Sequence, residues 1–216
     1  MVKRNATLKA EPKSTGSREK VYEIAAEVFH RKGYDNTSMS DIAQAVGLTK
    51  AGLYHHVTSK ESLLSTILED GMDMTEAYVV EPLATITDPL VRLKKLIELH
   101  LKLLLEGRKL AVTGLLHECQ SLASDDRLRI NHRKKQYVRM VADVIEDVVE
   151  SCGGRPIDPK VAALALLGML NWTYQWYKPS GTVTPEQVVE EFQSLFINGI
   201  LGHSGHSVDL PGLEGG

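Results

Sequence analysis

Residues 33–64 read GYDNTSMSDIAQAVGLTKAGLYHHVTSKESLL, and this stretch decides the fold. Ser38 and Asp41 have the Ser-x-x-Asp spacing of a capping box, so a helix is expected to begin here. Apolar residues follow at helical spacing until Gly47, which suits a helix end because glycine tolerates a positive φ. Thr49 then caps a third helix, Lys50 to about His56. Two short helices joined by a glycine turn predict a helix-turn-helix.

Longer helices are predicted on both sides of this pair. A helix starting near Ser17 carries apolar residues at i, i+3, i+4, i+7 and i+8, and Gly33 ends it. Thr58 with Glu61 forms a further capping box, from which a long fourth helix runs toward Val80. The head is therefore expected to hold three helices, and the fourth helix joins it to the remainder of the chain.

The remainder is helical too. Helical patterns recur at 88–105, 108–122, 126–151, 158–177 and 184–200, with Pro and Gly in the breaks and no strand alternation. The sequence predicts an all-α fold of about nine helices. Its expected parts are a flexible basic arm at 1–16, a helix-turn-helix DNA-binding domain at 17–62, a ligand-binding and dimerisation domain at 63–202 and a flexible tail at 203–216.

Charge is distributed unevenly along the chain. The net charge of −3 argues by itself against a nucleic-acid binder, but residues 1–60 hold ten Lys or Arg against six Asp or Glu. A basic first quarter on an acidic body is expected if only one end meets the DNA backbone. The chain lacks a signal core and any apolar run long enough to span a membrane, so a cytoplasmic protein is expected.

The second helix of the pair has the features of a recognition helix. Leu48 and Leu53 can anchor it, while small and polar residues are left to face a partner: Lys50, Ala51, Gly52, Tyr54 and His55. Small side chains let a helix approach the floor of a groove closely. On the pattern alone, a helical hairpin with no DNA role remains an equal alternative.

The stretch 33–64 resembles the DNA-binding domain of the tetracycline-repressor (TetR) family. The resemblance lies in the Gly-Tyr end of the first helix, the Thr-Ser-x-x-Asp-Ile-Ala helix, the Gly-Leu turn, the Tyr-x-His recognition helix and the Ser-Lys-Glu entry to the fourth helix. It implies a homodimeric, ligand-gated repressor on a palindromic double-stranded operator. It also implies phosphate contacts from Thr37, Tyr54 and Lys60, with bases facing Lys50, Ala51, Gly52 and His55. His55 and Val57 depart from the family's frequent Tyr and Phe, which leaves the sequence preference open.

Residues 171–181, NWTYQWYKPSG, hold both tryptophans of the chain. Trp172 and Trp176 are one helical turn apart and share a face. The segment resembles one in TetR-type repressors that respond to acyl-coenzyme A thioesters of lipid, sterol or aromatic-acid degradation. It implies an acyl-coenzyme A effector, although an apolar core stripe is an equally good reading of the same pattern, and a hydrophobic drug or a free acid could fill the same channel.

A coenzyme A effector would also need cations for its phosphates. Arg129 and Arg133 lie four residues apart at the basic start of a helix and could share a face, although a solvated helix face is the more common meaning of such a run. The predicted effector site is therefore made of Leu103, Leu116, Arg129, Arg133, Met169, Trp172, Trp176 and Tyr177.

Dimerisation is predicted through the last two helices, because a two-fold operator needs a two-fold protein. Small residues against large ones would allow four helices to pack closely. The predicted interface residues are Ala162, Leu166, Leu170, Phe192, Leu195, Phe196 and Ile200.

Neither an enzyme nor a metalloprotein is expected. The sequence offers no nucleophile with a base and no metal-ligand spacing, and His117 and Cys119 would point apart on a helix. His100, His203 and His206 are read as structural or incidental, and no cofactor is expected beyond the effector. An all-helical enzyme and a protein-binding adaptor are the less favoured alternatives.

Overall fold

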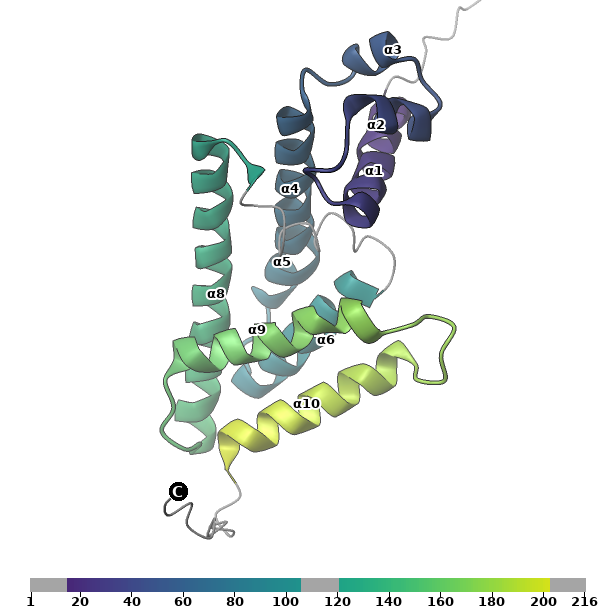
Figure 1. Cartoon of the computed structure of the whole chain (residues 1–216). Helices are drawn as coiled ribbons and strands as arrows, with labels where there is room; N and C mark the ends of the chain where they lie inside the picture. The colour runs from purple at the N-terminus through teal and green to yellow at the C-terminus, as the bar shows by residue number, and fades with distance from the viewer. Residues whose placement is uncertain (1–14, 106–120, 203–216) are drawn as a thin grey trace, which may run out of the picture.

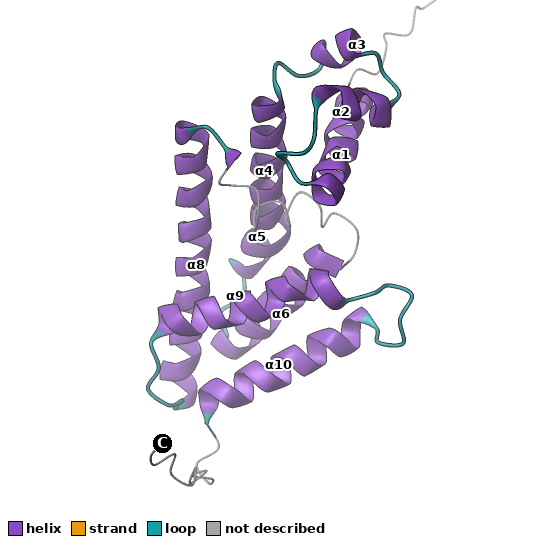
Figure 2. Ribbon diagram, in the orientation of Figure 1, coloured by secondary structure: helices purple, strands orange, loops and turns teal. Residues whose placement is uncertain are grey.

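The structure, a computed structural model, describes residues 15–105 and 121–202, and every regular element in these ranges is helical (Figure 2). In chain order the elements are α1 Thr15–Lys32, α2 Met39–Val46, α3 Lys50–Tyr54, α4 Lys60–Thr75, the π-helical segment η1 Glu76–Val80, α5 Glu81–Leu83, α6 Pro89–Leu105, α8 Ser124–Cys152, α9 Pro159–Trp176 and α10 Pro185–Leu201. The all-α prediction is confirmed. The predicted helix at 108–122 lies outside the described residues except for its last two positions, as do the arm before residue 15 and the tail after residue 202.

An N-terminal head is formed by α1, α2 and α3 with the first turns of α4 (Figure 1). α1 packs against α2 and α4, and α2 packs against α3. Gly33 and Gly47 end α1 and α2 at φ +77° and +78°, a conformation that costs a glycine little. The two predicted helix ends are therefore confirmed, and each lets the chain turn sharply into the next element.

The start of α4 differs from the prediction by one residue. Ser59, not Thr58, is the N-cap, and its hydroxyl accepts a hydrogen bond from the amide of Ser62 at 3.0 Å. The Ser62 hydroxyl accepts one from the amide of Ser59, also at 3.0 Å, which completes the capping box. The Thr58 and Glu61 box is wrong because the Thr58 hydroxyl bonds the Ser62 hydroxyl instead.

The C-terminal bundle consists of η1, α5, α6, α8, α9 and α10. α4 runs on through η1 and α5 into this bundle, where Val79 and Leu83 are buried in its core. α6 lies at the centre and packs against η1, α8, α9 and α10. None of the helices in the described ranges is both long and apolar enough to cross a membrane.

α8 belongs to both cores. Near its N-terminus it places Ile130, fully buried, in the core of the head, and farther along it places Val141, Ile145 and Val148 in the core of the bundle. Figure 1 shows α8 running beside α4 before it reaches α9. Two long helices therefore connect the head to the bundle, where the sequence predicted α4 alone.

Candidate DNA-binding surface and effector region

α3 presents the predicted recognition residues to solvent. The Thr49 hydroxyl accepts a hydrogen bond from the Gly52 amide at 3.0 Å and caps the helix, while Leu53 is fully buried beneath it. The exposed side chains are those of Lys50, Ala51, Tyr54 and His55. One short helix thus brings together a cation, an aromatic hydroxyl and an imidazole on a rigidly capped frame.

The local structure gives a reason for a glycine at position 52, in addition to the predicted close approach to the bases. A Cβ at this position would lie 3.2 Å from the Thr49 hydroxyl oxygen, a tight contact. That oxygen is the acceptor of the N-cap bond, so a larger residue would disturb the cap. Gly52 is itself half-buried.

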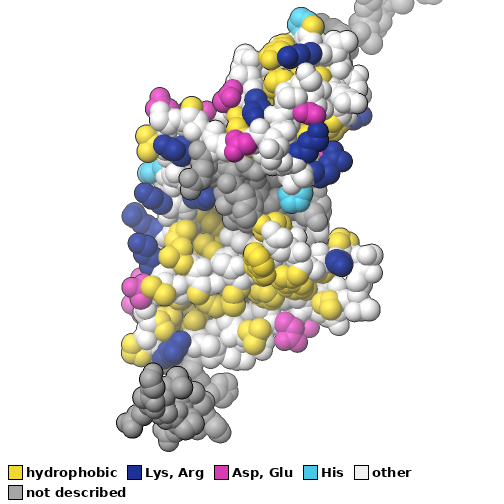
Figure 3. All heavy atoms as spheres, viewed as in Figure 1, with side chains coloured by type: hydrophobic (Ala, Val, Ile, Leu, Met, Phe, Trp, Pro, Cys, Tyr) yellow, Lys and Arg dark blue, Asp and Glu magenta, His cyan; other side chains and the backbone are white. Residues whose placement is uncertain are grey.

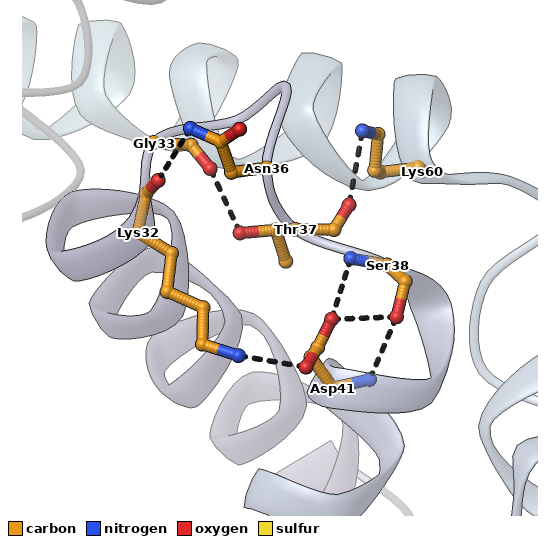
Figure 4. Close-up of polar contacts among 7 residues, drawn as sticks. All are labelled: Lys32, Gly33, Asn36, Thr37, Ser38, Asp41 and Lys60. Atoms are coloured by element: carbon orange, nitrogen blue, oxygen red, sulfur yellow. Dashed lines mark hydrogen bonds and ion pairs between the residues drawn. The ribbon is translucent and has the colours of Figure 1, made fainter.

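Lys60 reaches from α4 to the turn between α1 and α2 (Figure 4). Its ammonium donates to the backbone carbonyl of Tyr34 at 2.9 Å and to that of Thr37 at 3.0 Å, and it lies 4.1 Å from the centre of the Tyr34 ring. The Thr37 side chain is only 2% exposed, and its hydroxyl donates to the Gly33 carbonyl at 2.8 Å. The predicted phosphate contact of Thr37 therefore has no exposed side chain to make it, because the hydroxyl is used to close the end of α1.

A second polar link joins α1 to α2. Lys32 at the end of α1 pairs with Asp41 of α2 at 2.7 Å, and Asp41 also caps α2 through Ser38 (Figure 4). Hydrogen bonds from Lys32 and Ser38 hold the pKa of Asp41 well below its usual range. These contacts tie α2, which packs against α3, to the end of α1.

The two tryptophans lie on the outer face of α9. The exposed fractions are 62% for Trp172 and 44% for Trp176, and Met169 is exposed as well. The opposite face of α9, with Thr173 fully buried, points into the bundle. In the single chain these three residues do not line the interior as predicted, because the helix turns their face outward. Leu103 is buried in the core, Tyr177 is half-buried beside it, and Leu116 lies outside the described residues.

Most of the residues predicted to form the dimer interface are buried, whereas the tryptophans predicted to lie in the pocket are exposed. Four of them are buried in the core of their own chain and have no surface left for a partner: Leu166, Leu170, Phe196 and Ile200. Ala162 and Phe192 are partly buried against this core, whereas Leu195 is 66% exposed. The face of α9 predicted to meet a partner thus lies mostly in the core of its own chain, because both faces are apolar and helical periodicity alone does not say which one faces the core.

Arg129 and Arg133 bond to carboxylates of α4. Arg133 lies 2.8 Å from Asp73 and 3.0 Å from Glu69, and Arg129 lies 3.3 Å from Glu69 and 2.9 Å from Asp126. We call these five residues the ion-pair cluster. Since three carboxylates surround two guanidinium groups, the cluster carries a formal charge of −1, which does not favour the predicted phosphate site.

A buried polar triad was missed by the sequence reasoning. His100 of α6, 5% exposed, places Nδ1 2.8 Å from the hydroxyl of Tyr137 in α8 and Nε2 3.0 Å from Oδ1 of Asn171 in α9. Burial lowers the pKa of His100 to about 4, so the imidazole is neutral at physiological pH. In the sequence, the only signal for this triad is that its three polar residues interrupt otherwise apolar helical faces.

In the described part of the chain, no group of His, Cys, Asp and Glu could hold a metal ion, and His117, Cys119, His203 and His206 lie outside that part.

Two family models match the chain. Residues 21–67 match "Bacterial regulatory proteins, tetR family", and residues 87–200 match "Tetracyclin repressor-like, C-terminal domain". Together they cover the head and most of the bundle.

Known relatives and solved structures agree with these matches. The chain is 29% identical over 185 residues to the HTH-type transcriptional repressor KstR2 of Mycobacterium tuberculosis (strain ATCC 25618 / H37Rv), covering 85% of this chain and 92% of that protein. It is similar to the crystal structure of AibR in complex with isovaleryl coenzyme A and operator DNA, with 34% identity and a TM-score of 0.76 over 86% of this chain and 98% of that one. It is also similar to the structure of the ketosteroid transcriptional regulator KstR2 of M. tuberculosis, with 27% identity and a TM-score of 0.78 over 89% and 98%.

Proposed function

The chain belongs to the tetracycline-repressor family of transcriptional regulators, and we propose that it is a homodimeric repressor that binds a palindromic operator and is released by an acyl-coenzyme A thioester. The observation that carries the DNA-binding part is the exposed face of α3, held by its own cap, by Leu53 and by the links at Lys60 and Asp41. A recognition helix must be presented rigidly to make bidentate contacts with base edges.

On this face we assign Lys50, Ala51 and His55 to the bases and Tyr54 to a phosphate. Gly52 lets the helix start approach the groove. Lys60 is assigned to a phosphate as well, because an ammonium has three donors and two of them bond backbone carbonyls. Thr37 is left out of the assignment because it is buried.

The dimer is proposed to form through an apolar stripe on the outer face of α9 together with Leu195 of α10, whose helix meets the stripe where the Phe192 and Trp176 rings stack. The stripe consists of Val161, Leu164, Met169, Trp172 and Trp176, all exposed in the single chain. Figure 3 shows hydrophobic side chains gathered across this part of the bundle. An exposed, contiguous apolar patch is typical of a surface that another chain covers. This proposal moves both tryptophans from the effector pocket to the subunit interface.

The effector class is supported by the relatives and by the aromatic segment of α9. AibR has been crystallised with isovaleryl coenzyme A, at 34% identity to this chain, and the NWTYQWYKPSG segment is of the kind described above. We place the acyl group in the core of the bundle and do not assign the phosphates to Arg129 and Arg133, whose carboxylate partners occupy them. A repressor of the efflux type, which senses a hydrophobic drug or a free acid, is the second candidate.

The test is operator binding followed by release. Fluorescence anisotropy on the promoter beside the protein's own gene should show tight, salt-dependent binding, and His55→Ala should change which operator variants are preferred. A panel of acyl-coenzyme A thioesters and the matched free acids is then titrated into the complex. Release by thioesters alone supports the proposal. Equal release by the acids would leave the second candidate, and no sequence-selective binding would reject a DNA-binding function.

A further inference from the structure

The polar triad of His100, Tyr137 and Asn171 stands apart from its surroundings. Its residues come from α6, α8 and α9, three helices that build the core of the bundle, and the buried residues of that core are aliphatic except for Phe196. The His100 and Tyr137 rings stack at 5.9 Å with 20° between their planes. Apart from His100, the only buried polar residue among the described residues of this bundle is Thr173, whose hydroxyl bonds the Leu170 carbonyl of its own helix.

The hydrogen bonds of the triad have one consistent arrangement. Oδ1 of Asn171 can only accept, so Nε2 of His100 donates to it, and Nδ1 then accepts from the Tyr137 hydroxyl. In this arrangement Asn171 uses only its Oδ1, and Tyr137 uses only its hydroxyl hydrogen. Among the described residues, the two N–H groups of the Asn171 amide and the lone pairs of the Tyr137 oxygen have no further partner. Both residues are half-buried, and burial raises the pKa of the Tyr137 hydroxyl, which therefore stays protonated.

The triad is uncharged. The imidazole is held neutral by burial, and no Lys or Arg is buried in the described part of the bundle core. A carboxylate entering this region would lose its hydration without gaining a cation, which is strongly unfavourable. A carbonyl oxygen would lose far less and could accept from the Asn171 amide.

A buried polar network whose groups are all satisfied can serve structure alone, because it fixes a unique arrangement of the core. Here, among the described residues, the amide N–H groups of Asn171 and the lone pairs of the Tyr137 oxygen have no partner at the meeting point of three helices. This is the arrangement of a ligand pocket, in which a few polar groups fix orientation within an apolar lining.

We propose that His100, Tyr137 and Asn171 form the polar end of the effector site and select an effector with an uncharged acyl carbonyl over the corresponding free carboxylate. Asn171 donates to the carbonyl, and His100 acts as a positioning residue that holds Asn171 and Tyr137 in place. The inference rests on the proposed function, because it locates the effector in this bundle.

The test uses ligands without phosphates, so that only the acyl end is measured. S-acyl N-acetylcysteamine thioesters are compared by calorimetry with the S-alkyl thioethers, which lack only the carbonyl oxygen, and with the free acids. The wild-type protein should bind the thioester about tenfold more tightly than the thioether. It should bind the free acid at least about a hundredfold more weakly than the thioester at pH 7.5.

The variants Asn171→Leu and Tyr137→Phe separate recognition from folding. Asn171→Leu should bring the ratio of thioester to thioether affinity close to one while thioether binding is kept, whereas a structural defect would weaken both ligands together. Tyr137→Phe, which keeps the ring, should lower the same ratio. Tyr22→Phe in the head is the matched control and should leave it unchanged.

The outcomes distinguish this inference from the proposed function. A wild-type protein that binds thioester and thioether equally, or variants that keep the full preference, would overturn the role of the triad even if thioesters release the operator. A preference for the thioester that depends on the triad, without release of DNA, would support the site and reject the proposed regulation.

Discussion

Lys60 serves both the fold of the head and the proposed contact with DNA. Its ammonium bonds two backbone carbonyls in the turn after α1 and lies over the Tyr34 ring. We predict that Lys60→Ala lowers the free energy of unfolding by about 1–2 kcal/mol, since hydrogen bonds to charged groups are among the stronger ones. It should also weaken binding to all DNA sequences and lower the salt slope of binding by about 0.9.

Urea unfolding and anisotropy titrations at several salt concentrations measure the two effects separately. Lys32→Ala is the control, because Lys32 pairs with Asp41 and carries no proposed phosphate contact. A salt slope unchanged in Lys60→Ala would show that this lysine acts only within the fold.

His100 makes the stability of the bundle depend on pH. Burial lowers its pKa from 6.5 to about 4, so between these values the unfolded chain binds the proton more tightly than the folded one. The stabilisation is complete above about pH 6.5 and is lost as pH falls toward 4. We predict a loss of about 2 kcal/mol between pH 7.5 and pH 5, before most carboxylates titrate.

The measurement compares the pH dependence of unfolding in the wild-type protein and in His100→Phe. The variant should be less stable at pH 7.5, because the hydroxyl of Tyr137 and the amide of Asn171 lose their partner, but its stability should fall less toward pH 5. Parallel curves for the two proteins would mean that His100 has the same pKa in the folded and unfolded chains and that burial does not lower it.

At the scale of elements, the ion-pair cluster joins α4 to α8. Arg133 bonds Glu69 and Asp73 of α4 in a partly buried setting, one turn from Ile130, which lies in the core of the head. A ligand-driven movement of α8 would therefore move α4 as well. We predict that Arg133→Ala lowers stability by about 1 kcal/mol, since the pair is partly screened by solvent, and makes operator release less sensitive to the effector.

A double-mutant cycle of Glu69→Ala and Arg133→Ala should show losses that are less than additive, because each single change already breaks the same ion pair. Arg139→Ala, an exposed position on the same helix, is the control. If the double variant behaves as the sum of its single changes, the cluster does not couple the two helices.

The sequence predicted the head well because each helix end there has a local chemical cause. Ser38 and Thr49 cap, and Gly33 and Gly47 turn, without help from distant residues. The error at the start of α4, a cap displaced from Thr58 to Ser59, arose because neighbouring hydroxyls compete for the same amides.

The bundle was harder to predict because contacts between residues far apart in the sequence decide which side chains face the core. α9 is apolar on both faces, so only packing against α6 and α8 shows that Leu166 points inward and Trp172 outward. Arg133 looked like an available cation until the fold placed it beside Asp73. The triad joins residues separated by 37 and 71 positions, which no spacing rule detects.

For the whole molecule, α4 and α8 together make the head and the bundle one mechanical unit. α4 enters the bundle through η1, where Val79 is buried, and α8 contributes to both cores. A ligand in the bundle can thus change the spacing of two heads only if the bundles themselves are held together. The proposed release mechanism therefore requires the dimer, and its coupling is set by how differently the effector binds the two arrangements.

The last prediction concerns that dimer. Leu195 is 66% exposed on α10, three residues from Phe192, whose ring stacks with that of Trp176 in the apolar stripe. If this surface is the subunit interface, Leu195→Glu would bury a carboxylate without a partner. We expect light scattering to show a dimer for the wild-type protein and a monomer for the variant at micromolar concentration. Since both tryptophans lie on the stripe, their emission should shift to longer wavelength in the variant, and operator binding should weaken by more than about tenfold because each head meets its half-site alone.

Leu128→Glu is the matched control for this experiment. Leu128 is 68% exposed on α8, outside the stripe, so the same change in charge and size there should leave the dimer and the operator affinity intact. A wild-type protein that is already monomeric would reject the homodimer. A dimer that survives Leu195→Glu but dissociates in Leu128→Glu would place the interface on α8, and the tryptophans would then need another partner to cover them.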